Sequence, residues 1–423
     1  MLDIKFIREN KELLQTVAGQ KNIKIDLDKL VKLDDKRRTL NQKIDELRTQ
    51  KNQTSKEIPQ MAPKDREIAL EKMKVVDTEQ DKLEEQLKPL LVEINALMLE
   101  VPMYIHKDTP IALDESGNVS IKEAGEIRQF DFTIKDHVQL GKDLDIIDGE
   151  RGVKIGGSRA YVLKGDGARL EQSLLKYAQD FISRKGYTLM YVPVIVDRFA
   201  LEGTGFFPGS EDQIYHLEKD DKYLVGTSEV ALGAYYSNEV LDIKNIPCKM
   251  AGISTCFRRE AGTYGKDTSG VYRVHQFNKV EQFILCEGNE EKSQAMFDEL
   301  AKNVEEFLAS LKLPYRILNI CTGDMGRGKY QMYDFECWMP SRKNYGETHS
   351  CSNLHDFQAR RLNLRYKDAE GKINYCHTLN NTLVATPRIL IPILELNQNE
   401  DGSINIPEVL RPYMDNQEKI VKK

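Results

Sequence analysis

The chain has 423 residues, of which 30% are charged, and a formal net charge of -6 at pH 7. This length suggests two or three domains with ample apolar core, and the negative net charge excludes a globally basic nucleic-acid binder, so any RNA contact must come from local patches. No membrane-spanning run or signal peptide is evident, and seven scattered cysteines without a C-x-x-C pair indicate reduced thiols in a cytoplasmic protein, not a disulfide framework.

Residues 28–100 have the pattern of two long helices joined by a turn. Apolar side chains recur at three-four spacing from Leu30 to Leu47 and again from Met73 to Leu97, with the break EIPQMAPKD between them. This pattern predicts an antiparallel helical hairpin. Arms of about 30 residues extend roughly 45 Å at about 1.5 Å per residue. Pro89 lies inside the returning helix, where we expect a bend.

The two arms of this hairpin differ in charge. Residues 29–56 hold nine Lys or Arg against four Asp or Glu, whereas residues 71–100 hold four against eight. Most of these charges are expected to pair the two helices with each other. A protruding two-helix arm has little core of its own, so we also expect a partner, and a phosphate backbone suits the basic arm.

Beyond the hairpin the pattern becomes that of a mixed domain. Residues 101–153 are rich in Pro, Gly and acidic turns and read as a connector. Residues 168–185 carry a helical apolar stripe, and the strand TLMYVPVIV, interrupted by Pro193, follows. After the predicted strand DKYLV come three polar residues for which a helix cap is the simplest explanation, namely Thr227, Ser228 and Glu229.

The stretch from Phe257 to Phe283 predicts two antiparallel strands joined by a long mobile loop, GTYGKDTSG. Period two places Arg258 and Glu260 on one face of the first strand and Arg259 on the other. The second strand should present on one face Arg273, His275, Phe277, Lys279 and Glu281. Two arginines suit a triphosphate and an aromatic ring suits a purine, although a hairpin with solvated charges would explain such a stretch taken alone.

Two later segments carry further candidates. In GETHSCSNLHDFQARR, Glu347 and Ser350 supply hard oxygens that suit Mg²⁺. The neighbouring His349 and Cys351 invite a nucleophile or zinc interpretation, but neither a third ligand nor an orienting acid is evident. In HTLNNTLVATPRILIPILELNQ, Arg388 precedes a buried apolar run and therefore needs an anionic partner.

Together these segments resemble the seryl-tRNA synthetase family of class II aminoacyl-tRNA synthetases. FRRE with RVHQFNKVEQF resembles motif 2, ETHSCS with DFQARR is close to a signature of the family, and the segment around Arg388 resembles motif 3, with Asn381, Leu383 and Pro387 where bacterial members are rich in Gly and Ser. The resemblance implies an α+β fold: an N-terminal antiparallel helical hairpin, or coiled-coil arm, in residues 1–105, and a class II catalytic domain on an antiparallel β-sheet flanked by helices in residues 106–423.

The resemblance also implies a function. The expected enzyme attaches L-serine to serine tRNA through a seryl-adenylate, using ATP and Mg²⁺, and selenocysteine tRNA is left open as a second acceptor. The arm is expected to engage the long variable arm of serine tRNA. The helix and strand around residues 168–196 resemble motif 1, which implies a homodimer. With the cysteine pattern and the lack of an apolar span described above, we expect a cytoplasmic protein with no membrane partner, and no DNA partner is expected.

Site residues follow from matching the motifs position by position. Arg258 and Arg388 are the expected catalytic residues, and Glu347 and Ser350 the metal ligands. The expected serine-binding residues are Thr227, Ser228, Glu229, Arg258, Glu281 and Thr382. The expected ATP-binding residues are Arg258, Arg259, Glu260, Arg273, Val274, Phe277, Glu347, Thr348, His349, Ser350 and Arg388.

Two other hypotheses stay open at this point. A class II paralogue could activate a small amino acid for a non-tRNA carrier, although such enzymes usually lack the arm. An RNA-binding or scaffold protein could combine a coiled coil with a degenerate catalytic domain. The second hypothesis is disfavoured by the charged residues that the chain retains, Arg258, Arg273, Glu281 and Arg388.

Overall fold

The computed structural model describes residues 1–262 and 270–422 and separates into two compact units. One comprises Leu2–Pro102, and the other comprises Met1 with Met103–Lys423. The sequence had suggested a boundary between residues 105 and 106. Most of the loop GTYGKDTSG, which we expected to be mobile, lies outside the described residues.

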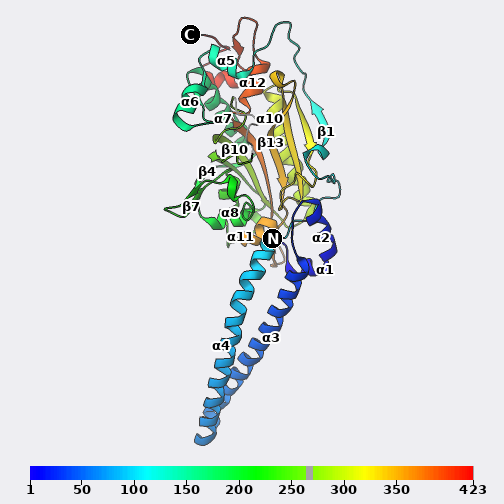
Figure 1. Ribbon diagram of the computed structural model, residues 1–423, viewed down its shortest axis with the longest axis vertical. Helices are drawn as coiled ribbons and strands as arrows, with labels where there is room; N and C mark the ends of the chain where they lie inside the picture. The colour runs from blue at the N-terminus through cyan, green and yellow to red at the C-terminus, as the bar shows by residue number, and fades with distance from the viewer. Residues whose placement is uncertain (263–269, 423) are drawn as a thin grey trace. The chain divides into compact units, whose positions relative to one another are not determined.

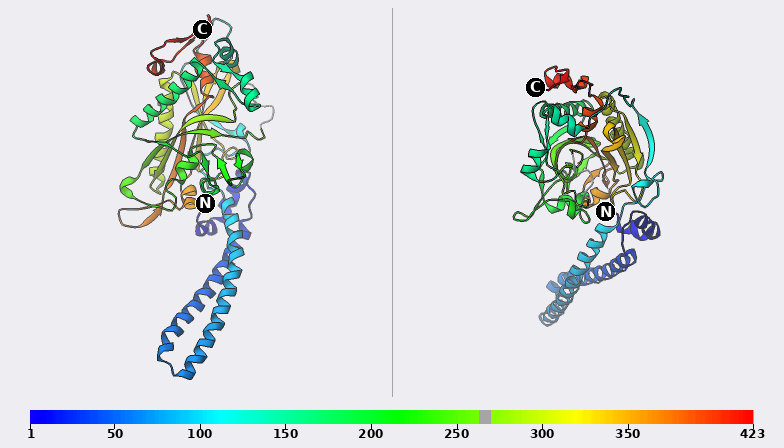
Figure 2. Two further views of the ribbon diagram at one scale, coloured as in Figure 1. Left: turned by 90° about the vertical axis from the view of Figure 1, so that its left-hand side faces the viewer. Right: turned by 45° about the horizontal axis from the view of Figure 1, so that its top comes forward.

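The N-terminal unit is dominated by two long helices, α3 (Leu27–Glu57) and α4 (Pro63–Glu100), which run antiparallel and side by side (Figure 1, Figure 2). They confirm the predicted hairpin. Asp26 caps α3 by accepting a hydrogen bond from the backbone of Lys29. The helix α4 is unbroken through Pro89. Two short helices precede the hairpin, α1 (Ile4–Glu9) and α2 (Lys11–Gln20), and the 3₁₀ turn η1 (Ile58–Gln60) lies between its arms.

The hairpin has a narrow apolar seam flanked by ion pairs. Buried side chains of the seam include Leu30, Leu33 and Ile44 from α3 and Ile94 and Met98 from α4. Three ion pairs join a basic residue of α3 to an acidic residue of α4: Lys29–Glu93 at 2.6 Å, Arg48–Glu84 at 2.9 Å and Lys51–Asp77 at 2.6 Å. Part of the charge difference between the arms therefore pairs the two helices, as predicted.

The larger unit is built on an eight-stranded sheet in which every pair is antiparallel except β4 with β9 (Figure 1). This confirms the predicted fold. In sheet order the strands are β1 (Val119–Ala124), β11 (Tyr315–Asn319), β12 (Gln331–Met339), β13 (Asn344–Asn353), β16 (His377–Thr386), β10 (Gln276–Cys286), β9 (Cys248–Phe257) and β4 (Thr188–Tyr191). The predicted hairpin is the β9–β10 pair, with Phe257 opposite Gln276.

Two long helices, α7 (Asp166–Arg184) and α10 (Glu290–Ser310), pack against the sheet. The alternating direction of the side chains along β10 explains why these helices cover one face of the sheet. Val280 and Ile284 join Leu174 of α7 and Phe307 of α10 in the main apolar core, whereas the intervening Lys279 and Glu281 belong to the other face. The strand thereby separates a helix-covered face from a face that carries buried charges.

Shorter elements complete the unit. The helices are α5 (His137–Asp143), α6 (Gly149–Gly156), α8 (Arg198–Thr204), α9 (Glu229–Ala234), α11 (Phe357–Leu362) and α12 (Leu390–Leu396). The strands outside the main sheet are β2 (Ile147–Asp148), β3 (Val162–Leu163), β5 (Ile195–Val196), β6 (His216–Leu217), β7 (Lys222–Leu224), β8 (Val240–Asp242), β14 (Arg365–Lys367), β15 (Ile373–Tyr375), β17 (Ile404–Asn405) and β18 (Lys419–Ile420). Over the described ranges, no helix has the length and apolar character needed to cross a bilayer.

Candidate active site

One cavity collects residues from the three segments that the sequence singled out. From the β9–β10 segment and the residues between these strands come Arg258, Glu260, Val271, Tyr272, Val274, Phe277 and Lys279; from β13 come Glu347, Thr348, His349 and Ser350; and from β16 and the turn after it come Thr382, Ala385, Thr386, Pro387 and Arg388. Two cations and a carboxylate that are far apart in the sequence, Arg258, Arg388 and Glu347, therefore lie around the same cavity.

The two arginines each lie over an aromatic ring. The guanidinium carbon of Arg258 is 5.3 Å from the centroid of Phe277, and that of Arg388 is 4.5 Å from the centroid of Tyr272. Arg258 also donates a long hydrogen bond, 3.4 Å, to the carbonyl of Gly226. Arg388 donates to the carbonyl of Tyr272 at 3.0 Å. Since each guanidinium has five N–H donors, both can also bind an anion.

Glu347 is the acidic partner of Arg388. Its backbone carbonyl and its Oε2 accept from Nη1 of Arg388 at 3.1 and 3.3 Å. The Glu347 side chain is 47% exposed, so water weakens this pair. An anionic ligand could therefore replace Glu347 as a partner of the arginine at little cost.

The residues between β9 and β10 depart from the predicted alternation. Both Val274 and Phe277 line the cavity, and His275 does not; its Nδ1 lies 2.9 Å from the carbonyl of Arg258. The prediction that His275 shares a face with Phe277 is therefore wrong. The reason is that β9 ends at Phe257 and β10 begins at Gln276, so period two does not apply between them.

Two predicted ATP residues from this stretch, Arg259 and Arg273, do not line the cavity. Arg273 donates to Oε2 of Glu260 at 3.4 Å, and Glu260, whose φ is +52°, also pairs with Arg159 at 3.7 Å. Arg259 lies over the ring of Tyr215 at 5.8 Å. Arg259 therefore does not share the cavity with Arg258, as period two predicts.

Hard oxygen donors gather at β13. Glu347 and Ser350 line the cavity, and Asp334 of β12 stands directly opposite Ser350. Oδ1 of Asp334 is buried without a hydrogen-bond partner, and burial together with the charge of Glu347 raises the pKa of this carboxyl. Within residues 1–262 and 270–422, no three His, Cys, Asp or Glu are grouped to hold a metal by themselves. The donors therefore fit Mg²⁺ if a ligand supplies further oxygens.

His349 and Cys351 do not form a nucleophilic pair. Nε2 of His349 donates to the carbonyl of Leu383 at 3.0 Å, and burial lowers the pKa of His349 to about 3. Burial also raises the pKa of the Cys351 thiol well above its ordinary value. A neutral imidazole bonded to the backbone and a protonated thiol have a structural role.

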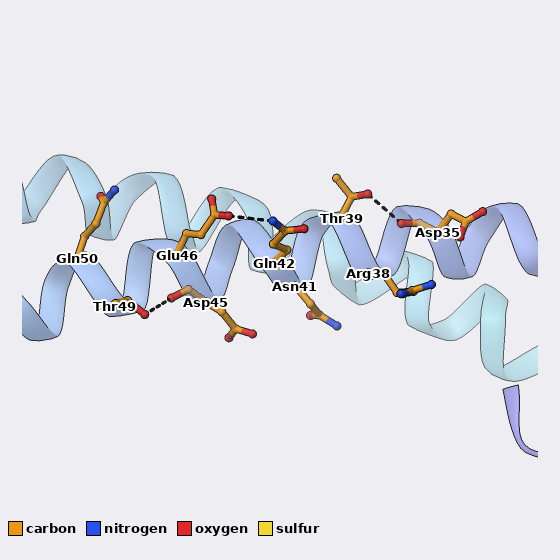
Figure 3. A pocket seen from close by; sticks show the side chains of 9 residues that line it. All are labelled: Asp35, Arg38, Thr39, Asn41, Gln42, Asp45, Glu46, Thr49 and Gln50. Carbon is orange, nitrogen blue, oxygen red and sulfur yellow. Dashed lines mark hydrogen bonds between the residues drawn. The ribbon is translucent and has the colours of Figure 1, made fainter. Parts of the chain in front are cut away.

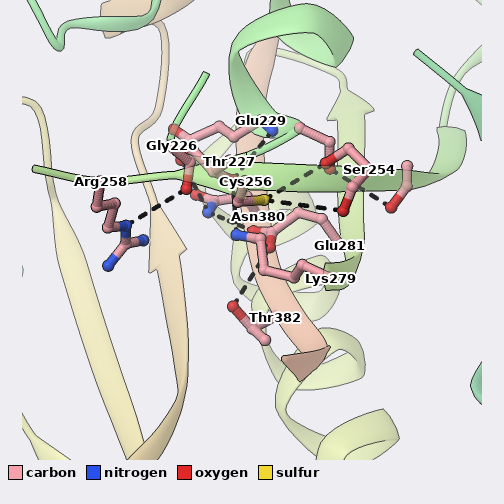
Figure 4. Close-up of polar contacts among 12 residues, drawn as sticks. Gly226, Thr227, Glu229, Ser254, Cys256, Arg258, Lys279, Glu281, Asn380 and Thr382 are labelled. Carbon is pink, nitrogen blue, oxygen red and sulfur yellow. Dashed lines mark hydrogen bonds and ion pairs between the residues drawn. The ribbon is translucent and has the colours of Figure 1, made fainter. Parts of the chain in front are cut away.

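At one end of the cavity, buried charges satisfy one another (Figure 4). Glu281, only 1% exposed, accepts from Asn380 Nδ2 at 3.0 Å and from the hydroxyl of Thr382 at 3.3 Å. It also pairs with Lys279, which is 4% exposed and donates to the hydroxyl of Thr227 at 2.6 Å. Segments around residues 227, 280 and 381 are thereby joined in one polar network.

A second carboxylate extends this network. Glu229, 4% exposed, accepts from Gln358 Nε2 at 2.7 Å and from Asn380 Nδ2 at 3.1 Å. Asn380 thus bridges Glu229 and Glu281. Lys329 lies 4.0 Å from Oε1 of Glu229, so each buried carboxylate has a cation nearby, which a buried charge requires.

Thr227, Ser228 and Glu229 are divided between the start of helix α9 and the buried polar network. The backbone N–H of Glu229 donates to Oγ1 of Thr227 at 3.2 Å, so Thr227 supports the start of α9 while facing Lys279. Ser228 is fully buried, and its hydroxyl donates to the carbonyl of Gly252 at 3.4 Å. Ser228 therefore contacts β9 and not the charged network.

Sequence reasoning missed four members of the network, Lys279, Lys329, Gln358 and Asn380. Lys279 was placed on the correct face but given no role, although a lysine two residues before Glu281 on one strand face is a natural partner for it. Asn380 and Gln358 gave no local signal, because their carboxylate partners lie between 99 and 151 positions away in the chain.

Comparisons with known proteins agree with this arrangement. Residues 1–105 match the seryl-tRNA synthetase N-terminal domain, and residues 214–397 match the tRNA synthetase class II core domain (G, H, P, S and T). A serine–tRNA ligase of Deinococcus radiodurans is 43% identical over 418 residues, covering 99% of this chain and 98% of that protein. One of Nitrosopumilus maritimus is 40% identical over 423 residues, covering 99% and 100%. The crystal structure of seryl-tRNA synthetase from Pyrococcus horikoshii complexed with ATP superposes with a TM-score of 0.91 at 37% identity, covering 100% of both chains.

Proposed function

Because the chain belongs to the seryl-tRNA synthetase family and attaches serine to tRNA at the expense of ATP, we propose that its cavity holds both small substrates. ATP lies over Phe277 between the two arginines, and serine lies beside Glu281. The observation that carries this proposal is that Arg258, Glu347 and Arg388 line the same cavity as Lys279 and Thr382, which contact the buried Glu281.

Serine is recognised at the buried end. Its hydroxyl bonds to Glu281 and Thr382, and its ammonium group is held near Glu229 and Thr227. These groups are already fixed by Asn380 and Lys279. Alanine would leave buried polar groups unpaired, a larger penalty than one missing contact with a methyl group.

ATP is held at the more exposed end by positive charge. Arg388 binds the terminal phosphates with its planar fork, and Arg258 bridges the α-phosphate and the carboxylate of serine. The serine carboxylate attacks the α-phosphorus in line, forming seryl-adenylate and pyrophosphate, and the arginines offset the charge of the two anions as they approach. Glu347 and Ser350 would hold Mg²⁺, which when bound adds positive charge beside the phosphates.

The transfer step involves the helical arm. The proposed partner is the variable arm of serine tRNA, held by exposed cations of α3. Lys32, Lys36 and Lys43 share one helix face, whereas the neighbouring face drawn in Figure 3 mixes Arg38 with Asp35, Asp45 and Glu46. Of these two faces of α3, the lysine face is the one that suits a phosphate backbone. Binding of lysines to phosphates weakens steeply as the salt concentration rises.

The chain is proposed to act as a cytoplasmic homodimer. On β4, at the edge of the sheet, Tyr191 is 81% exposed and Leu189 37% exposed, and Phe199 on α8 is 52% exposed. Large apolar side chains exposed near an unpaired edge are typical of a surface that another copy covers.

Exchange of pyrophosphate into ATP, measured with each standard amino acid in turn, tests the assignment of substrate. Serine alone should support strong exchange, and Glu281→Ala should abolish it while the protein stays folded. Near-normal exchange by that variant would refute the proposed serine site. The comparisons give no support to loading of a non-tRNA carrier or of selenocysteine tRNA.

Replacing Lys32, Lys36 and Lys43 together by Gln tests the arm separately. Exchange should be unchanged, whereas aminoacylation of serine tRNA should weaken and lose part of its salt dependence. The matched control changes Arg38, on the mixed face, to Gln. Equal aminoacylation by the triple variant and the natural protein would contradict the proposal that the lysine face binds tRNA.

A further inference from the structure

A buried carboxylate outside the charged network joins three distant segments next to the ATP end. Glu171 of α7 is 7% exposed, and its Oε1 accepts from Asn278 Nδ2 at 3.2 Å and from the hydroxyl of Thr386. Asn278 is opposite Thr386 in the β10–β16 pair and opposite Thr255 in the β9–β10 pair. The hydroxyl of Thr255 donates to Oδ1 of Asn278 at 2.9 Å. A polar layer therefore crosses three strands and is closed by one carboxylate from α7.

The layer is adjacent to both residues proposed to hold ATP. Asn278 follows Phe277 directly, and Thr386 lies two residues before Arg388. Both donors to Glu171 are neutral. A buried carboxylate with only neutral partners is costly, and a neutral glutamine would accept the same two hydrogen bonds at a lower cost. Stability alone therefore does not account for an acid at this position.

The pairing of β10 with β16 shows what the acid can control. The register shifts between Val280, which pairs with Val384, and Glu281, which pairs with Thr382, so that Leu383 is an extra residue in β16. A bulge of this kind interrupts the ladder, and the alignment on one side then does not dictate the alignment on the other. Glu281 and Thr382 lie on one side of the bulge, and Phe277 and Arg388 lie on the other.

We propose that Glu171 is a positioning residue for the ATP end of the cavity. By accepting from both Asn278 and Thr386 with one oxygen, it fixes the register of β10 against β16 beyond the bulge and so sets where Phe277 and Arg388 lie relative to each other. It does not touch ATP. This inference rests on the proposed ATP roles of Phe277 and Arg388.

The test compares Glu171→Met, which keeps the length of the side chain without an acceptor, with Glu171→Gln, which keeps one. In ATP–pyrophosphate exchange, Glu171→Met should lower kcat/KM for ATP by about tenfold to a hundredfold, because small displacements of binding groups are costly. KM for serine should stay within about twofold, because the serine site lies across the bulge. Glu171→Gln should recover most of the loss. Gln172→Met, at an exposed position of the same helix, is the control.

Thr386 gives a second pair of variants in case Glu171→Met does not fold. Thr386→Val removes the donor and should reproduce the selective loss, whereas Thr386→Ser keeps the hydroxyl and should not. Combining Thr386→Val with Glu171→Met should add little further loss, because the two changes break the same contact. Equal losses for serine and ATP, or an unchanged kcat/KM for ATP in folded Glu171→Met, would overturn the inference.

Arg388→Ala in the same assay distinguishes failure of the positioning role of Glu171 from failure of the proposed ATP site on which that role rests. If that variant keeps its kcat/KM for ATP, the proposed ATP site is wrong. If it loses activity toward ATP while Glu171→Met does not, the ATP site stands and only the positioning role fails.

Discussion

The two ends of the cavity hold charge in different ways. At the end proposed to hold serine, the serine end, Glu281 and Lys279 are 1% and 4% exposed, and they are bonded to each other and to neighbouring side chains. At the end proposed to hold ATP, the ATP end, the Glu347 side chain is 47% exposed and that of Arg388 21%, and their closest side-chain contact is 3.3 Å. One end is assembled before any ligand arrives, and the other keeps cations in weak contacts that a ligand can replace.

This difference matches the ligands proposed for the two ends. A small neutral amino acid offers few contacts, so its pocket must be rigid and fully hydrogen-bonded to discriminate. A triphosphate supplies several charges of its own and can displace exposed partners such as Glu347 at little cost. Removing a charged partner should therefore affect stability and activity together at the serine end, and activity alone at the ATP end.

Lys279→Met should have the largest effect. It leaves Glu281 buried without its cation and Thr227 without its donor. The free energy of unfolding should fall by about 3–5 kcal/mol, and serine-dependent exchange by about a thousandfold, measured by urea unfolding and by ATP–pyrophosphate exchange. Lys249→Met on the neighbouring strand, whose partner Glu299 is partly exposed, is the matched control. A variant as stable as the control would contradict the idea of a preassembled end.

Arg388→Lys should come next, with a different signature. The change keeps the charge but loses the planar fork, so kcat/KM for ATP should fall by about a hundredfold. The free energy of unfolding should stay within about 0.5 kcal/mol, because the pair with Glu347 is exposed. Steady-state exchange kinetics and urea unfolding check both statements. A large loss of stability would show that the two ends are not built differently.

Thr382→Val should have a smaller effect, confined to the choice of amino acid. Its hydroxyl donates to Oε2 of Glu281 at 3.3 Å. Losing one hydrogen bond of this kind costs about 1–2 kcal/mol, so the preference for serine over alanine should fall by about tenfold. The ratio of kcat/KM values for serine and alanine measures this preference, and the kinetics with ATP serve as the internal control. An unchanged ratio would remove Thr382 from the serine site.

The smallest effect concerns His349, which lines the ATP end of the cavity. Its pKa is lowered to about 3 by burial, below an unfolded value of about 6.5. The unfolded chain therefore binds a proton first, and the stability that the neutral ring contributes is lost as pH falls from about 6.5 toward 3, by about 1.4 kcal/mol per pH unit.

The variant His349→Gln, which keeps a donor for the Leu383 carbonyl, should remove this contribution. Urea unfolding between pH 6 and pH 5 compares its pH slope with that of the natural protein. Identical slopes would mean that the imidazole is not held neutral by the fold.

Residue patterns were sufficient to predict the helices and strands that depend on interactions between residues close together in the sequence. Apolar spacing from Leu30 to Leu97 predicted the helical arm, because an amphipathic period depends on neighbours three or four positions apart. Turn chemistry between two apolar strands predicted the β9–β10 hairpin. The residue order in FRRE, ETHSCS and the segment around Arg388 indicated the family and its reaction.

Only the tertiary structure decided how these residues combine. The ends of β9 and β10 placed Val274 at the cavity in place of His275, and the bulge at Leu383 separated Glu281 and Thr382 from Phe277 and Arg388. Asn380 and Glu171 received roles from partners more than 90 positions away. Local sequence sets helix and strand periods through neighbouring residues, whereas the partners of a buried charge depend on which distant segments the folded sheet brings together.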